Sequence, residues 1–122
     1  MGTQTTERNT KERLQTAIAL KIDGRYDEAE TILREILDGE PDDPQARREF
    51  ALVLGFTGRF EESIEELRRV VELDGNCLEA RNDLAMTYAM IGMIDEARGE
   101  FETVLTMDPT NAMALRQIVY FQ

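Results

Sequence analysis

The chain has 122 residues, of which 42% are hydrophobic and 32% are charged, and its formal net charge at pH 7 is −11. This length suits one domain with a modest core, and the negative charge argues against a protein that binds nucleic acid through a basic face. With no histidine and one cysteine, the chain cannot form an internal disulfide and lacks the usual zinc ligand sets.

The N-terminal segment, residues 1–9, is polar and lacks the apolar core of a signal peptide. We expect this segment to be disordered. Along the rest of the chain, no apolar run approaches the roughly 20 residues that cross a membrane. We therefore expect a soluble, cytoplasmic protein that does not bind membranes.

One phrase recurs three times at a fixed interval. It reads GRYDEAE from Gly24, GRFEESI from Gly58 and GMIDEAR from Gly92, so that each copy follows the last by 34 residues. Self-similarity at such a period is typical of a solenoid. The same interval relates Ala17, Ala51 and Ala85, and it relates Leu33, Leu67 and Phe101.

Each unit has the pattern of two helices. In the second unit, residues 50–54 follow helical spacing, and Gly58 is placed to end that helix in the left-handed conformation. An amphipathic run over residues 60–74 predicts the second helix. No segment has strand character, so the predicted fold class is all-α.

Residues at the predicted helix ends add local signals. Asp43 before Pro44 predicts an N-cap followed by proline in the first helical turn. Asn76, with Glu79 three residues later, predicts a capping box. The Leu-Asp-Gly motif that begins at Leu37 comes two residues earlier in register than its counterpart in the second unit, which predicts a shortened second helix in the first unit.

The pattern resembles the tetratricopeptide repeat, a helix–turn–helix unit of the same length with small and aromatic residues at set places. The resemblance covers one domain, residues 10–122, as units 10–43, 44–77 and 78–111 with a terminal helix over 112–122. The end-of-repeat proline is present in the first and third units, but glycine replaces it in the second, and the early tryptophan is missing throughout. The resemblance implies a right-handed superhelical solenoid whose first helices line a concave groove. It also implies a non-enzymatic protein that binds a peptide or protein segment.

The geometry of the family assigns groove residues to the first helix of each unit and to the terminal helix. This surface is largely apolar with mixed charges, and methionine and aromatic side chains suit an adaptable groove. For Leu14, Leu52 and Met86, packing between neighbouring repeats is an equally open interpretation. The predicted groove residues are Ile18, Lys21, Ile22, Arg48, Glu49, Leu52, Phe56, Glu79, Asn82, Asp83, Met86, Met90, Arg116 and Tyr120.

One subfamily of the repeat holds the C-terminal carboxylate of chaperone tails with a clamp of lysine, arginine and asparagine. The matching positions here are Leu14, Ile18, Glu49, Glu79 and Asp83, and none carries the required residue type. The resemblance therefore does not extend to that function. A ligand with apolar anchors and a basic residue near the three acidic positions fits better.

The acidic residues are concentrated in the second helices. Segments 26–38, 60–74 and 94–108 hold 16 acidic and 4 basic residues, whereas the rest of the chain holds 9 acidic and 10 basic residues. We interpret this charge as a solvated outer face, which favours solubility. The alternative is an acidic docking face for a basic partner.

The tail, residues 112–122, is similar to the first helix of a fourth unit that lacks its second helix. Terminal repeats need a polar outer face, and this one is apolar. Either the chain is a fragment of a longer array, or another copy covers the end in a homodimer. The residues predicted for self-association are Leu115, Ile118, Val119 and Phe121.

Motifs of catalysis are missing from the chain. Without histidine the common nucleophilic triads cannot form, and no glycine-rich loop has the spacing of a phosphate-binding loop. We predict no enzymatic activity, no cofactor and no metal. The predicted function is a protein–protein interaction scaffold that binds a segment in its groove, and the alternative is a structural module that self-associates through its terminal helix.

Overall fold

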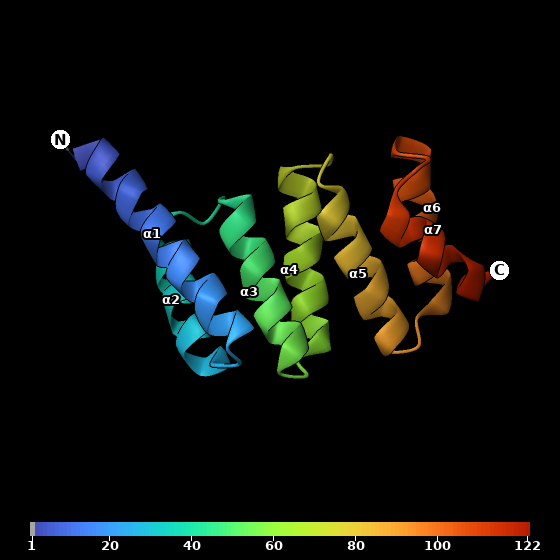
Figure 1. The fold of residues 1–122 in the computed structure, drawn as a ribbon, viewed down its shortest axis with the longest axis horizontal. Coiled ribbons are helices and arrows are strands. Elements are labelled where there is room, and N and C mark those ends of the chain that lie inside the picture. Colours follow the sequence, from blue (N-terminus) through green and yellow to red (C-terminus); the bar gives the residue numbers. More distant parts are fainter. Residues whose placement is uncertain (1) are drawn as a thin grey trace.

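The computed structural model describes the backbone of residues 2–122 and the side chains of residues 9–122, and over this range the chain forms helices joined by short turns. Figure 1 shows these helices following one another along the long axis, from α1 at one end to α7 at the other. The predicted all-α solenoid is confirmed over the described residues. Its elements are α1 (Gly2–Ile22), α2 (Tyr26–Gly39), α3 (Pro44–Phe56), α4 (Phe60–Leu73), α5 (Leu78–Met90), α6 (Ile94–Met107), α7 (Ala112–Ile118) and a final 3₁₀ turn, η1 (Val119–Phe121).

The helices pack as three consecutive pairs with α7 as a fourth first helix. α1 packs on α2, α3 on α4 and α5 on α6, and the second helix of each pair packs on the first helix of the next. In addition, α3 contacts both α1 and α5. The first helices therefore lie side by side and form one face of the solenoid, which we call the groove face.

The second helices repeat at a constant interval. α2, α4 and α6 begin 34 residues apart and have 14 residues each. The predicted shortening of the second helix in the first unit is therefore wrong. Gly39 is the last residue of α2 rather than its terminator, because packing against the neighbouring helices determines the helix length.

The turns within the pairs depend on glycine. Gly24, Gly58 and Gly92 have φ angles of +80°, +83° and +84°, a region that residues with a Cβ atom rarely adopt. At the end of α3, the N–H of Gly58 donates to the carbonyl of Gly55 at 3.1 Å, and the N–H of Arg59 donates to the carbonyl of Leu54 at 2.9 Å. This pattern satisfies carbonyls at the helix end. The prediction for Gly58 is confirmed.

The substitution Gly58→Ala is expected to lower the free energy of unfolding by about 1–2 kcal/mol. A Cβ atom at residue 58 would meet no other atom within 4 Å, so the cost comes from the backbone alone. Gly99→Ala in α6, where space is equally open and φ is not positive, should instead stabilise by about 0.5–1 kcal/mol. Urea unfolding of both variants measures the difference, and equal effects would contradict the argument.

One of the two predicted helix caps is confirmed and the other is wrong. The carboxylate of Asp43 accepts hydrogen bonds from two backbone N–H groups in the first turn of α3, at 3.0 and 3.1 Å, which confirms the N-cap. The predicted capping box at Asn76 is wrong, because α5 begins after Cys77. The N–H of Asn76 is instead held at 3.1 Å by the carboxylate of Asp74, within the preceding turn.

At the N-terminal end, residues 2–9 are helical, although the sequence predicts disorder for residues 1–9; Met1 lies outside the described residues. Polarity alone does not exclude a helix. Once the packed part of α1 has nucleated, each added residue contributes one backbone hydrogen bond at little cost, and the segment contains no proline.

The core repeats with the same interval as the turns. The small residues Ala17, Ala51 and Ala85 of the first helices are fully buried, and so are the large side chains Leu33, Leu67 and Phe101 of the second helices. Small residues let two helices approach closely, and the large ones fill the remaining space. The core is therefore distributed along the solenoid, each part lying between a helix pair and its neighbour.

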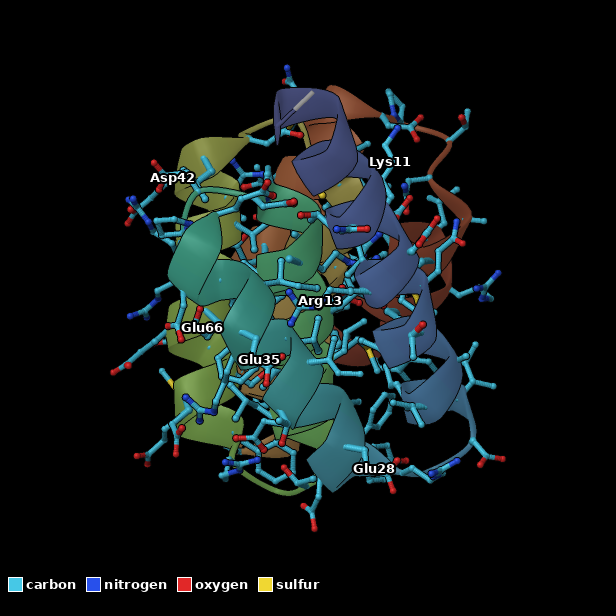
Figure 2. All side chains as sticks on the ribbon, turned by 90° about the vertical axis from the view of Figure 1, so that its left-hand side faces the viewer. Lys11, Arg13, Glu28, Glu35, Asp42 and Glu66 are labelled. Atoms are coloured by element: carbon cyan, nitrogen blue, oxygen red, sulfur yellow. The ribbon has the colours of Figure 1, made fainter. Side chains whose placement is uncertain are left out.

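Charged side chains link the helices around this core. Figure 2 shows Arg13 of α1 beside Glu35 of α2, with which it forms an ion pair, and it shows Asp42 and Glu66 on the side opposite Lys11. Glu30 accepts hydrogen bonds from Arg34, at 2.8 Å, and from Arg59 in the next repeat. The bond from Arg59 is the main reason why the pKa of Glu30 lies below its ordinary value of 4.5.

The lowered pKa of Glu30 predicts a pH dependence. At this site the folded protein binds fewer protons than the unfolded chain, so the stabilisation is fully present above pH 4.5 and is lost as the pH falls through the lowered pKa. Glu30→Gln should therefore destabilise the protein at pH 7 and have a smaller effect at a pH well below the ordinary value of 4.5. Urea midpoints at both pH values measure this, with Glu61→Gln, an exposed carboxylate, as the control. A constant difference would contradict the prediction.

Candidate functional site

Ion pairs join the first helices across the groove face. The ammonium of Lys21 on α1 lies 2.7 and 3.0 Å from the two carboxylate oxygens of Glu49 on α3. On the same helix, Arg48 donates to Asp83 on α5 at 2.7 Å and lies 3.1 Å from the exposed Glu79. Each pair therefore joins one unit to the next.

A hydrogen bond between amides replaces the ion pair at the last junction. Asn82 of α5 donates to the side-chain oxygen of Asn111 at 3.1 Å, and this same oxygen accepts the N–H of Ala114 and caps α7. Asn82 is buried, and its own side-chain oxygen has no hydrogen-bond partner within the described part of the chain. The residues predicted for the polar part of the groove thus also hold the repeats together.

These contacts occupy two of the three acidic groove residues with partners inside the chain. Glu49 is only 5% exposed and is neutralised by Lys21. Burial raises the pKa of Asp83 above its ordinary value, and the hydrogen bond from Arg48 opposes that shift. The expectation of a ligand's basic residue near Glu49, Glu79 and Asp83 stays a prediction, although the carboxylates of Glu49 and Asp83 already have partners within the chain.

Apolar side chains occupy the other half of the groove face, and we call them the apolar strip. They form two rows, each with the 34-residue interval of the repeat. Phe56 and Met90 are 60% and 63% exposed, and the ring of Phe56 stacks on Tyr26 with centroids 5.7 Å apart. The strip consists of Ile18, Leu52, Met86 and Tyr120 in one row and Ile22, Phe56 and Met90 in the other.

Burial bears on the alternative for three groove positions, and Met86, although it lies in the strip, also packs against the core. Leu14 is a buried member of the core, whereas Leu52 and Met86 are half-buried in the strip. Arg116 of α7 and Tyr120 of η1 are exposed. The groove therefore stays a prediction, and its residues on α1, α3 and α5 combine an apolar strip with internally paired charges.

A hollow of about 220 Å³ opens in the strip between α3 and α5. Its position depends on Gly55, because the equivalent residues 21 and 89 are lysine and alanine. The side chain of Lys21 occupies the corresponding place between α1 and α3, where it reaches Glu49. Sequence reasoning missed Gly55, although its departure from the repeat was a usable signal. The hollow is lined by Ala51, Leu52, Gly55, Phe56, Ser63, Asp83, Met86, Thr87 and Met90.

The tail residues separate into two groups. Leu115 and Val119 are 48% and 60% exposed, whereas Ile118 packs against the core. Phe121 is buried with its ring 5.5 Å from that of Phe101, and its carbonyl accepts a hydrogen bond from Arg98. The prediction of Phe121 as a self-association residue is corrected, because its own chain already covers it.

Other kinds of site have little support in the described residues. No group of three or more cysteine, aspartate and glutamate side chains there could hold a metal ion. None of the helices in that part of the chain is long and apolar enough to cross a membrane. Cys77 is a half-buried free thiol at the cap of α5.

Helix pairs at a constant 34-residue interval, with a groove along their first helices, define a solenoid of helix–turn–helix repeats. The tetratricopeptide repeat model matches residues 20–77, and the same interval continues through the helices that follow. Residues 20–77 therefore belong to the tetratricopeptide repeat family, and the described chain as a whole has the fold of these repeats. Comparison with curated protein sequences found no significant match.

Several solved structures share the fold. The first TPR domain of Spaghetti (RPAP3), bound to the HSP90 peptide SRMEEVD, has a TM-score of 0.87 at 18% identity, over 93% of this chain and 90% of that one. The second TPR domain of human RPAP3, in complex with the HSP70 peptide SGPTIEEVD, has a TM-score of 0.82 at 19% identity, over 89% and 91%. MamA from Desulfovibrio magneticus RS-1 has a TM-score of 0.83 at 19% identity, over 92% and 63%.

Proposed function

We propose that the protein is a non-enzymatic adaptor that binds a segment of another protein along its groove face. The observation that carries the proposal is the apolar strip, in which Phe56 and Met90 are largely exposed beside an apolar hollow. Burying such side chains contributes roughly 25 cal/mol per Å² of apolar surface. Exposed apolar patches of this kind commonly mark interaction sites.

The same contacts restrict the ligand. The apolar strip favours a segment with apolar anchors on one side, as in helix-in-groove recognition. The buried charges of the groove are paired within the chain, so they favour uncharged polar groups on the other side of the segment.

Peptides that end in EEVD, such as those bound by the two RPAP3 domains, need a different groove. Of the matching positions, Leu14 is buried and Glu49 carries a negative charge, so neither supplies a cation for a terminal carboxylate. We expect SRMEEVD to show no saturable binding, whereas an amphipathic peptide with leucine at positions i, i+3, i+4 and i+7 should bind.

The test uses protein with ¹³C-labelled methionine methyl groups. The amphipathic peptide should shift the signals of Met86 and Met90, which line the hollow, and leave that of Met107 on α6 unchanged. Phe56→Ala combined with Met90→Ala should weaken binding at least about tenfold, since each removes a large apolar contact. Met107→Ala, at an exposed site outside the groove, is the matched control. Unchanged binding by the double variant would contradict the proposal.

A second candidate function is self-association through α7. Leu115 and Val119 are exposed, whereas the residues one repeat earlier are Arg81, which pairs with Glu100, and the fully buried Ala85. The surface of α7 and η1 that would face a following helix is therefore apolar and exposed. Light scattering over a tenfold concentration range tests the idea with Val119→Glu, since Ile118 also supports the core. A monomer at all concentrations would contradict it.

A further inference from the structure

The hollow adjoins a second depression across the turn between α3 and α4, which we call the edge recess. Phe56 and Met90 line the hollow, and Gly58 and Ile91, next along the chain, line the recess. Both depressions are thus lined by residues at the same ends of α3 and α5, and two to three residues of an extended ligand span about 7–10 Å. The recess is lined by Gly58, Arg59, Phe60, Glu61, Glu62 and Ile91.

The edge recess is acidic. Glu61 and Glu62 are exposed, and neither forms an ion pair within the described part of the chain. They lie in the first turn of α4. Arg59, the cation of the recess, is engaged by Glu30 through hydrogen bonds that also raise the pKa of its guanidinium. The recess therefore presents two carboxylates to a ligand.

This combination is absent one repeat earlier. There the place of the hollow is taken by Lys21, and in the corresponding depression Glu28 pairs with Arg25 at 2.6 Å. The second turn thus joins an open apolar hollow to two carboxylates that form no ion pair within the described part of the chain, although the charge of Glu62 contributes to the raised pKa of Arg59.

The chemistry of the hollow restricts the ligand's first contact. Asp83 is its one charged lining residue among the described side chains, and Arg48 already neutralises that carboxylate at 2.7 Å. A cavity of about 150 Å³ admits a benzene ring, so the hollow has room for a phenylalanine, leucine or methionine side chain. A charged side chain there would lose its hydration without gaining a partner.

We propose that the hollow and the edge recess form a two-point site for a protein segment in which a large apolar residue is followed, within two or three residues, by lysine or arginine. The apolar side chain enters the hollow, and the cation lies against Glu61 and Glu62. This inference rests on the proposed function, because it requires the groove to bind a segment.

The test uses three blocked peptides and the methionine signals of Met86 and Met90. The parent is acetyl-Gly-Phe-Gly-Lys-Lys-amide, and its matched versions replace phenylalanine with alanine or both lysines with glutamate. We expect the parent to shift both signals, the alanine version to give no shift, and the glutamate version to bind at least about tenfold more weakly at low salt. Salt should reduce the difference between the lysine and glutamate versions.

Protein variants test the two points separately. Gly55→Leu should fill the hollow and abolish the shifts caused by the parent peptide. Since a Cβ atom there meets only the hydroxyl of Ser63, at 3.6 Å, the variant should fold, and a thermal melt verifies this. Glu61→Lys combined with Glu62→Lys should make the glutamate peptide bind better than the lysine peptide. Asp38→Lys combined with Glu72→Lys, at exposed sites near the far ends of α2 and α4, makes the same change in net charge and should leave the preference intact.

The outcomes distinguish the two proposals. The two-point site is overturned, and groove binding stands, if the parent peptide shifts Met86 and Met90 but the glutamate peptide binds equally well. The same conclusion follows if the Asp38→Lys and Glu72→Lys control changes the preference between the lysine and glutamate peptides as much as the Glu61→Lys and Glu62→Lys variant does. If neither these peptides nor the amphipathic peptide shifts Met86 or Met90, the proposed function fails as well. If Gly55→Leu binds the parent peptide unchanged, the hollow is not the anchor site.

Discussion

Replacing Lys21 with methionine is expected to lower the free energy of unfolding by about 3 kcal/mol at pH 7. The ammonium of Lys21 lies 2.7 Å from the carboxylate of Glu49, and the side chains of the two residues are only 15% and 7% exposed. Removal of the cation leaves a buried negative charge without its partner, and burial of an unpaired charge is costly. Urea unfolding followed by circular dichroism measures the loss.

A double variant identifies the cause of that loss. Lys21→Met combined with Glu49→Met removes both charges and should recover most of the stability, because an apolar pair of similar volume often replaces a buried ion pair at no cost. Glu49→Gln alone should cost less than Lys21→Met, since the remaining ammonium retains some access to water. A double variant that is no more stable than Lys21→Met would contradict the argument.

Replacing Phe101 with alanine is expected to cost about 3–5 kcal/mol, the largest effect predicted for this protein. Phe101 is fully buried in α6, and its ring packs 5.5 Å from that of Phe121. The substitution leaves a cavity and removes the surface against which the last turn packs. Because a domain of this kind has a total stability of about 5–15 kcal/mol, the loss is a large fraction of it.

The loss should be local, because each repeat contacts only its neighbours. Hydrogen exchange of Phe101→Ala should accelerate most in α5, α6 and α7, and that of Leu33→Ala, at an equally buried position in α2, should accelerate most in α1, α2 and α3. Phe121→Ala, near the chain end, should cost clearly less than Phe101→Ala. Uniform acceleration along the chain in both core variants would contradict the repeat-by-repeat picture.

The repeat and its turns could be predicted from the sequence because their causes are local. Gly24, Gly58 and Gly92 each take a left-handed conformation that few other residues tolerate, so their interval also gives the interval of the helix pairs. The buried small and large residues follow the same interval, since every unit meets an equivalent neighbour. The wrong predictions, such as the capping box at Asn76, concern helix ends, where several short-range hydrogen-bond patterns have similar energies.

The groove face was partly predictable. The apolar strip follows from the interval and the periodicity of the first helices, and Phe56 and Met90 are exposed there. The partners of Glu49 and Asp83 were not predictable, because each lies on another helix, 28 or 35 residues earlier in the chain. Which cation reaches which carboxylate depends on how two helices are packed side by side.

By itself, the sequence determined the class of fold, the length of the repeat and the face on which apolar side chains gather. These depend on backbone conformation and helical periodicity, which each short segment carries within itself. Only the tertiary structure decided that the charges of the groove are paired, that Phe121 is covered, and that Gly55 leaves a hollow where Lys21 fills the equivalent place. The physical reason is that burial and pairing belong to contacts between helices, and the same residue is a binding group or a structural one according to what packs against it.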